Sequence, residues 1–198
     1  YAATLTNDNA RKEAIYKKTV ELYPNDYRAY NNLGMMAYAN GDLASAENYF
    51  KQAASKNANA AEVNTNLGLI ELTKGNVANA ETYLSKSTGA NTANEALGNL
   101  YIKQGQYDRA VQAFGDTKTN SAALAQILAK DYNKAKSTLS AVKNPDAYTN
   151  YLMAIVGART NNADLVKSSM DKVKQQDATL AAKAQNDREF AKYANEIK

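Results

Sequence analysis

The sequence contains neither cysteine nor histidine, and it has only two prolines and nine glycines among 198 residues. The absence of thiols and imidazoles excludes zinc fingers, cysteine nucleophiles, Ser-His-Asp triads and histidine general bases. A carboxylate-only site is not excluded, but Asp42, Asp108 and Asp131 fit turn or capping positions better. No stretch of 18 uninterrupted apolar residues is present, so we expect no membrane insertion of this segment. The sequence therefore predicts a protein that is not an enzyme and that holds no metal and no cofactor.

The sequence also lacks a dense cluster of basic residues. The sequence has 24 basic and 20 acidic residues, which gives a net charge of +4. The basic excess lies in residues 91–198, where it is dispersed as single lysines. Nucleic-acid-binding proteins usually cluster Lys and Arg along one surface. We therefore expect no nucleic-acid partner.

The first residue is Tyr1 rather than Met, and no apolar signal segment follows it. We expect the sequence to begin inside a longer precursor or at a trimmed boundary.

An internal repeat organises the rest of the sequence. Three segments share a Leu-Gly pair, a second Gly seven residues after the first, an Ala five residues later, and Phe or Leu four residues after that. Two weaker copies keep the spacing of twelve between the first and the second small residue, although the last copy has Val at its second position. These paired positions are Gly34 and Ala46, Gly68 and Ala80, Gly98 and Ala110, Ala123 and Ala135, and Ala154 and Val166.

The spacing within a copy is constant, whereas successive copies advance by 34, 30, 25 and 31 residues. Length changes therefore fall between copies and never inside one. This predicts five units of two antiparallel helices, in which the small residues allow a close approach. Each pair leaves an apolar face that the next pair covers.

Glycine and capping residues mark the predicted turn inside each unit. Gly41 ends a first helix, where a left-handed residue is favoured, and Asp42 follows as the N-cap of the second helix. Asn76 is predicted to be the N-cap in the next copy. Lys130 and Asn161 replace the glycine in the last two copies. Asparagine tolerates the left-handed conformation and lysine does so poorly, which makes the turn at Lys130 the weakest part of the pattern.

The Leu-Gly pair, the Gly-Asp/Asn/Gln turn, the Ala and the following Phe or Leu resemble the tetratricopeptide-repeat (TPR) family, over about residues 8–176. The resemblance implies an all-α fold, a right-handed α-α superhelix (TPR solenoid) of about five irregular helix pairs, with a preceding helix and a C-terminal helical cap. It further implies a protein-binding scaffold. We divide this single domain into a leading helix (1–26), repeats at 27–60, 61–90, 91–115, 116–146 and 147–176, and cap helices at 177–198.

The cap is expected to contain two short helices. Asp177 and Asn186 are the predicted N-caps, and Glu189 follows Asn186 at the spacing of a capping box.

In TPR proteins the first helices of successive repeats line a concave groove. By resemblance, the groove-facing residues of this sequence are Arg28, Asn31, Asn32, Met35, Tyr38, Glu62, Asn66, Leu69, Asn99 and Lys103. The same positions also include Ala39, Thr65, Leu72, Thr73, Thr92, Glu95, Ala96 and Ile102.

Two interpretations of this groove follow. The carboxylate clamp of one TPR subtype needs cationic residues, but Asn31 and Thr92 stand where Lys is required and Ala96 where Arg is required. Chaperone-tail binding is therefore not expected. Asn32 and Asn66 precede successive Leu-Gly pairs and can donate to and accept from a peptide backbone. The alternative is that both are ordinary exposed helix residues.

The equivalent face of the last repeat is apolar and contains Tyr148, Tyr151, Leu152 and Ile155. An apolar patch of this kind marks a partner site if it is exposed. The alternative is that the C-terminal helices cover it.

The leading function is a scaffold that binds a protein or an extended peptide in the groove. The alternative is a structural spacer or oligomerisation element of a larger cell-envelope protein, and a homo-oligomer is left open. A role in glycan uptake has only analogy in its favour.

Three stretches, YPNDYRAYNNLG, AFGDTKTNSAALAQILAKDYNKAKSTL and YLMAIVGARTNN, resemble the TPR segment of OmpA-like outer-membrane proteins of Gram-negative bacteria. That resemblance implies the periplasm or an association with the outer membrane.

Overall fold

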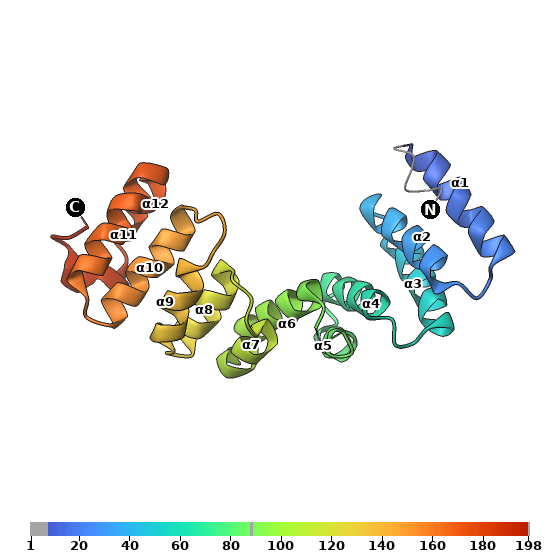
Figure 1. Ribbon diagram of the computed structural model, residues 1–198, viewed down its shortest axis with the longest axis horizontal. Coiled ribbons are helices and arrows are strands. Elements are labelled where there is room, and N and C mark those ends of the chain that lie inside the picture. The colour runs from blue at the N-terminus through green and yellow to red at the C-terminus, as the bar shows by residue number, and fades with distance from the viewer. Residues whose placement is uncertain (1–7, 88, 198) are drawn as a thin grey trace. The chain divides into compact units, whose positions relative to one another are not determined.

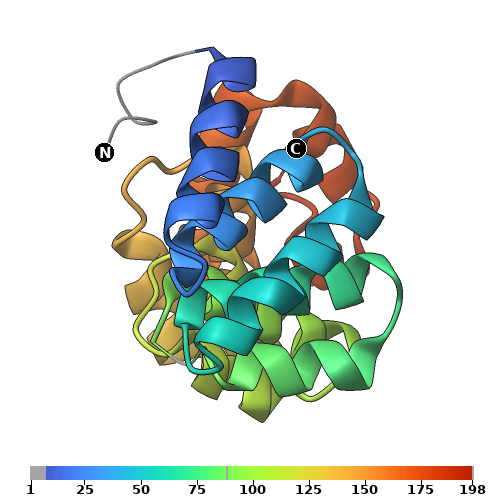
Figure 2. The same cartoon turned by 90° about the vertical axis from the view of Figure 1, so that its right-hand side faces the viewer.

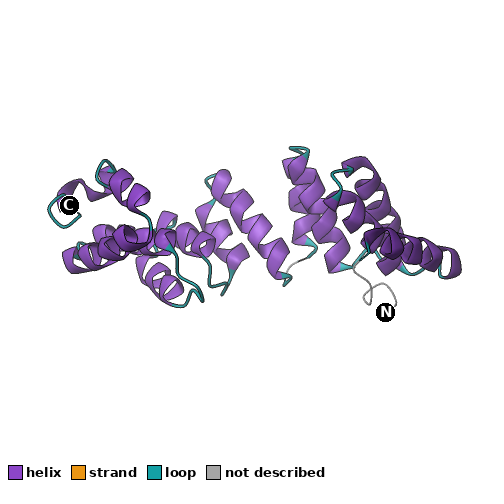
Figure 3. Ribbon diagram, turned by 90° about the horizontal axis from the view of Figure 1, so that it is seen from above, coloured by secondary structure: helices purple, strands orange, loops and turns teal. Residues whose placement is uncertain are grey.

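A computed structural model of the chain describes residues 8–87 and 89–197. Over these residues the regular structure is helical and contains no strand (Figure 3). The chain divides into two compact units, Tyr1–Ala96 (unit 1) and Leu97–Lys198 (unit 2). The predicted all-α fold is confirmed, and each unit is described by itself.

Unit 1 contains a leading helix followed by two helix pairs (Figure 1). The leading helix packs against the first helix of the first pair (Figure 2). Three residues separate the two helices of a pair, and the pair packs along its length. The helices are α1 (Asn9–Leu22), α2 (Tyr27–Ala39), α3 (Leu43–Lys56), α4 (Ala61–Thr73) and α5 (Val77–Ser85), and unit 1 also holds the start of α6 (Asn91–Lys103).

Unit 2 holds the rest of α6 and the remaining pairs, and it ends in a short α-helix and a 3₁₀ turn. Over the described residues, α6 and α7 complete the five predicted helix pairs, which follow the preceding helix and are followed by the helical cap. These helices are α7 (Tyr107–Phe114), α8 (Asn120–Leu128), α9 (Tyr132–Ser140), α10 (Ala147–Arg159), α11 (Ala163–Gln176), α12 (Ala178–Ala184) and η2 (Arg188–Tyr193).

The constant spacing of twelve has a direct cause in helix packing. A Cβ atom placed on Gly34 would lie 2.5 Å from Cε1 of Phe50, which is buried on the second helix of the pair. Gly98 meets Phe114 in the same way, at 2.5 Å. An aromatic ring therefore lies directly on the backbone of the first helix. Any insertion inside the pair would move the ring away from the glycine, so length varies only between pairs.

The turn at Lys130 has the same form as the others, although the sequence makes it the weakest. Lys130 adopts a φ of 65° and Asn161 a φ of 52°, beside the φ of 80° at Gly41. The amide of Lys130 donates to the carbonyl of Ile127, and the next amide donates to the carbonyl of Gln126 at 2.8 Å. Satisfying these helix-terminal carbonyls requires a left-handed residue. Packing thus imposes the turn on a residue that disfavours it.

The two predicted N-caps of unit 1 differ in their hydrogen bonds. Asp42 accepts a hydrogen bond from the amide of Ser45, as predicted. Asn76 is the N-cap residue of α5, as predicted, but its side chain makes no capping hydrogen bond. Its NH2 group instead donates to Oε2 of Glu71 at 2.9 Å. The side-chain orientation that reaches this buried carboxylate does not bring the carbonyl oxygen of Asn76 to the first amides of α5.

The cap of the C-terminal segment is also corrected. Asp177 caps α12 by accepting from the amide of Leu180. The second cap residue is Asp187 and not Asn186, because Asp187 accepts from the amide of Glu189. The element that follows is a 3₁₀ helix, so the segment contains the two predicted short helices, the second of them of the 3₁₀ type.

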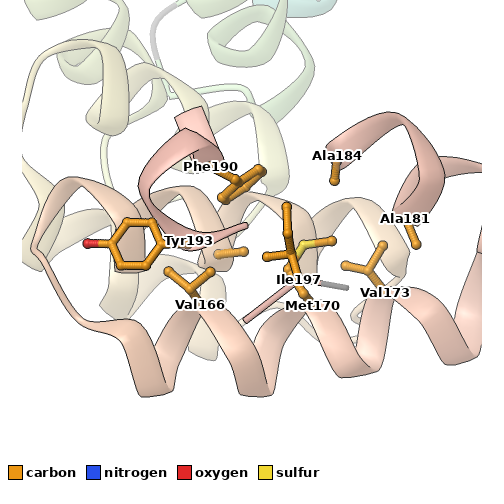
Figure 4. Packing of buried hydrophobic residues seen from close by; sticks show 9 residues of the cluster. Val166, Met170, Val173, Ala181, Ala184, Phe190, Tyr193 and Ile197 are labelled. Atoms are coloured by element: carbon orange, nitrogen blue, oxygen red, sulfur yellow. The ribbon is translucent and has the colours of Figure 1, made fainter. Parts of the chain in front are cut away.

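The C-terminal segment completes the core of unit 2. Phe190, Tyr193 and Ile197 cover the faces of α10 and α11 that no further helix pair covers within the described chain (Figure 4). The cluster consists of Ala154, Val166, Met170, Val173, Ala181, Ala184, Phe190, Tyr193 and Ile197.

Candidate functional site

Two hydrogen bonds connect the first helices of the two pairs in unit 1. The hydroxyl of Tyr27 donates to Oε1 of Glu62 at 2.8 Å. The amide Nδ2 of Asn66 donates to Oδ1 of Asn31 at 2.9 Å. Both bonds join residues 35 positions apart, so they fix the register of α2 against α4. We call the exposed surface that these two helices share the α2–α4 surface.

A small apolar hollow lies beside the asparagine pair on this surface. It has a volume of about 60 Å³ and is lined by Met35, Tyr38, Leu69 and Asn66, together with Phe50. Met35 is 47% exposed and Tyr38 39% exposed, which is unusual for large apolar side chains in this chain. The hollow thus offers exposed apolar side chains next to two amide groups.

Asn32 lies on the other side of Met35, where it faces α1. It lines a second hollow of about 250 Å³ between α1 and α2. The structure therefore brings Asn66 together with Asn31, and it places Asn32 in a different hollow. The other residues that line this second hollow are Asn9, Lys12, Tyr16, Met35, Met36, Ala39 and Asn40.

Arg28 is held by an intramolecular partner at the edge of the surface. Its Nε and Nη2 donate to the two carboxylate oxygens of Asp26, at 2.9 and 2.7 Å. The hydrogen bond from Arg28 lowers the pKa of the Asp26 carboxyl group. The hydrogen bond from Tyr27 to Glu62 raises the pKa of that phenol. Arg28 and Glu62, which carry opposite charges at this edge, thus each have a hydrogen-bond partner within unit 1.

A buried carboxylate on α4 belongs to a hydrogen-bond network that links the two helix pairs of unit 1. The side chain of Glu71 is 6% exposed and pairs with Lys74 at 3.0 Å. Burial alone would raise its pKa, but hydrogen bonds from Lys74, Asn76 and Asn79 hold that pKa below its usual value. Lys74 also reaches Glu47 on α3 at 3.1 Å. The network joins α3, α4 and α5, and the repeat pattern did not reveal it because its members occupy variable positions.

The remaining predicted groove residues fall into two groups. Asn99 and Lys103 are exposed on the second half of α6, in unit 2. Thr65 is wrong as a groove residue, because it is 5% exposed and its hydroxyl donates to the carbonyl of Ala61 at 2.8 Å.

The apolar patch of the last repeat is largely covered. The hydroxyl of Tyr151 donates to the carboxylate of Asp187, and the Tyr151 ring meets Phe190 edge to face at 5.6 Å. Leu152 is buried, and Ile155 packs between two core clusters. Tyr148 is the most exposed member, at 41%. The C-terminal segment therefore covers Tyr151 and Ile155, in line with the second interpretation, whereas Leu152 is buried against α8 and α9.

Sequence reasoning missed the contribution of α1 to the site. Asn9, Lys12 and Tyr16 face Asn32 across the second hollow. Their spacing of three and four residues places them on one face of α1. That spacing is a signal that could have been read from the sequence, since the segment was predicted to be a helix.

Two further observations limit the chemistry of the described residues. No three carboxylate side chains of residues 8–87 and 89–197 lie close enough together to hold a metal ion. In the same part of the chain, no helix has the length and apolar character needed to cross a membrane.

Comparisons with known families identify the chain. Three tetratricopeptide-repeat family models match it, at residues 15–48, 37–95 and 94–118. Together they run from residue 15 to residue 118, which is more than half of the sequence. The chain belongs to the tetratricopeptide-repeat family, whose members are generally non-enzymatic scaffolds for protein–protein interactions. No curated protein matches the sequence.

Solved structures share the fold. YrrB, described as a TPR protein with an unusual peptide-binding site, has a TM-score of 0.67 at 18% identity, over 85% of this chain and 97% of that one. PilF of Pseudomonas aeruginosa has a TM-score of 0.69 at 14% identity, over 94% and 89% of the two chains. PilW, a type IV pilus biogenesis factor, has a TM-score of 0.60 at 18% identity, over 95% and 90%. The likeness to OmpA-like proteins stays a prediction.

Proposed function

We propose that this TPR protein is a scaffold that binds an extended peptide of a partner protein along the α2–α4 surface. The observation that carries the proposal is the asparagine pair beside the apolar hollow. The hydrogen bond between the two side chains leaves the N–H groups of Asn31 and the carbonyl oxygen of Asn66 available to other partners. These groups match the alternating donors and acceptors of an extended backbone.

The hollow beside the pair supplies a pocket for one apolar side chain. Met35 is flexible and polarizable, which suits it to side chains of different shape. Tyr38 combines an apolar ring with a polar tip and is exposed at the rim. Binding would therefore depend on one apolar anchor and on backbone hydrogen bonds, and it would tolerate variation elsewhere in the peptide. YrrB, which shares the fold, is named for a peptide-binding site.

The test uses peptides selected from a random peptide library on the whole chain. We expect Asn31→Ala/Asn66→Ala to weaken the selected peptides about tenfold, since each lost hydrogen bond contributes about 0.5–1.5 kcal/mol. Asn48→Ala/Asn59→Ala is the matched control, because both residues are exposed in unit 1 away from the hollow. Isothermal titration calorimetry measures the affinities. Equal binding to both double variants would refute the role of the pair.

A second candidate function is a structural spacer or oligomerisation element of a larger cell-envelope protein. The cover of the C-terminal segment over Tyr151 and Ile155 favours it, because that part of the face is occupied within the chain. Light scattering combined with size-exclusion chromatography tests this candidate. A monodisperse monomer that selects no peptide supports the spacer, and a defined oligomer supports the assembly role. Fractionation of cells that express the full-length protein tests the proposed periplasmic or outer-membrane location.

A further inference from the structure

A hollow of about 370 Å³ opens in unit 2 between the second helices of two successive pairs, α9 and α11. The first turns of α10 form its floor, and α10 packs against both of these helices. The volume lies at the lower end of the range found for ligand pockets, which is about 300–1,000 Å³.

The hollow combines apolar, polar and cationic side chains. Leu139 of α9, Met153 of α10 and Leu165 of α11 provide apolar surface, beside the polar Thr149 and Asn150 of α10. Lys136 of α9 and Lys172 of α11 stand on the two opposite walls. An apolar strip between two cations is thus open to solvent.

Neither lysine has an acidic partner. No aspartate or glutamate lines the hollow, and neither Lys136 nor Lys172 forms an ion pair with a described residue. The nearby Asp171 is engaged by Lys167 at 3.0 Å instead. Two unpaired ammonium groups at one hollow attract an anion.

Ser169 adds an unused donor at the same place. It is 4% exposed and lines the hollow, yet its hydroxyl has no hydrogen-bond partner among the described residues. Two neighbouring serines behave in the ordinary way, since Ser140 and Ser168 donate to carbonyls of their own helices at 2.9 and 3.3 Å. The Ser169 hydroxyl is reached from the open hollow, so it can donate to an acceptor that enters there.

We propose that the hollow between α9 and α11 binds an acidic peptide segment in which carboxylates flank an apolar side chain. The apolar side chain packs on Leu139, Met153 and Leu165, and the carboxylates pair with Lys136 and Lys172. Ser169 donates to an acceptor of the peptide. The site lies in unit 2 and is independent of the proposed role of the α2–α4 surface.

The arrangement favours a peptide over other anions. An inorganic anion would leave the apolar side chains of the hollow uncovered. A fatty acid or lipid carries its charge at one end, whereas the two lysines stand on opposite walls. Charge on both sides of an apolar group is what an acidic–apolar–acidic peptide provides.

The experiment is an NMR titration of the ¹⁵N-labelled 198-residue chain. The probe is a capped peptide of two glutamates, two leucines and two glutamates. We expect shifts of amides in α9, in the first turns of α10 and in α11. A peptide with glutamine for glutamate, and one with glycine for leucine, should each bind about tenfold more weakly.

Charge-reversal variants distinguish binding at the hollow from non-specific attraction of the acidic peptide to a basic protein. We expect Lys136→Glu/Lys172→Glu to weaken the probe at least about tenfold. Lys134→Glu/Lys183→Glu changes the net charge equally at two exposed residues outside the hollow, and should leave the affinity unchanged. Ser169→Ala should weaken binding about threefold. Far-UV circular dichroism establishes that each variant is folded.

Several outcomes would overturn the proposal. These are equal binding of the glutamine peptide, equal binding to the two double variants, or equal shifts with inorganic phosphate alone. Self-association of the chain through α9 and α11 would show a second copy to be the occupant. Shifts confined to α2 and α4 would assign the probe to the surface of unit 1, so this failure is distinct from a failure of the proposed function.

Discussion

At the scale of single residues, the contact of Gly34 with Phe50 governs the helix pair. The sequence pattern alone identified Gly34 and its spacing to Ala46, because small residues at fixed distance indicate close helices. The pattern did not reveal that the ring of Phe50 lies over the glycine itself.

We predict that Gly34→Ala destabilises the protein by about 1–2 kcal/mol, even though alanine favours helix. The new methyl group would lie 2.5 Å from the ring of Phe50, which is 1% exposed, so the ring must shift from its packed position. Urea denaturation measures the loss. Gly34→Ala/Phe50→Ala should lose less stability than the sum of the two single variants, because the methyl group no longer meets a ring. A Gly34→Ala variant as stable as the wild type would contradict the packing argument.

Lys130 is a second residue of interest at this scale, because it adopts the left-handed backbone conformation that lysine disfavours. Its φ of 65° costs a non-glycine residue about 1–2 kcal/mol. We predict that Lys130→Gly stabilises the protein by about 1 kcal/mol, seen as a higher urea midpoint at unchanged slope. Lys134→Gly, inside α9, is the matched comparison and should destabilise by about 1 kcal/mol. If both variants lose stability, the left-handed turn is not the cause.

At the scale of elements, the buried carboxylate of Glu71 connects three helices of unit 1. Its pKa is lowered in the folded state, so its contribution to stability is present above the pKa of the unfolded chain, about 4.3. That contribution is lost as the pH falls through the folded pKa.

We predict that the urea midpoint of the wild type drops between pH 5 and pH 3, and that Glu71→Gln drops less over the same range. The variant should be less stable than the wild type at pH 7, since Lys74 loses a partner. Glu21→Gln removes an exposed carboxylate of α1 and should keep the wild-type slope. A Glu71→Gln slope equal to that of the wild type would show that other carboxylates carry the effect.

The C-terminal segment is an element that the sequence predicted only in outline. Asp177 was found as a cap because it precedes an alanine-rich helix. The cap at Asp187 was missed because Asn186 has equally good spacing, and only the packing of Phe190 decides between them.

At the scale of the whole molecule, stability should be distributed along the chain. In repeat proteins each unit contacts its neighbours, so stability is approximately a sum of local terms. Phe190→Ala removes a ring that is 1% exposed and should cost about 3–5 kcal/mol locally.

We predict that hydrogen exchange in Phe190→Ala becomes faster in α10, α11 and α12, and stays as in the wild type in α2 to α5. Gly34→Ala should show the reverse distribution. Mass spectrometry of peptic fragments resolves these helices. Equal loss of protection along the chain in either variant would indicate one cooperative unit instead.

The fold was predictable from the sequence to a greater extent than the candidate site. Helix pairs follow from residues such as Gly98 and Ala110, whose spacing repeats. The site depends on contacts between side chains 35 positions apart on α2 and α4. The rotation of each helix about its own axis determines that Asn66 meets Asn31 and not Asn32. The unpaired lysines of the α9–α11 hollow belong to no repeat position, so no pattern could have marked them.

The hydrogen bond from Asn66 to Asn31 has a consequence for any peptide bound on the α2–α4 surface. Because Asn66 donates one N–H and Asn31 accepts it, the two-residue pair is not symmetric. Asn31 offers two N–H groups from α2, and Asn66 offers its carbonyl oxygen and its second N–H from α4. In an extended peptide, the C=O and N–H groups that meet this pair belong to one residue in one chain direction, and to residues i and i+2 in the other. The spacing therefore differs between the two directions, and we expect the surface to bind a peptide and its reversed sequence with different affinities.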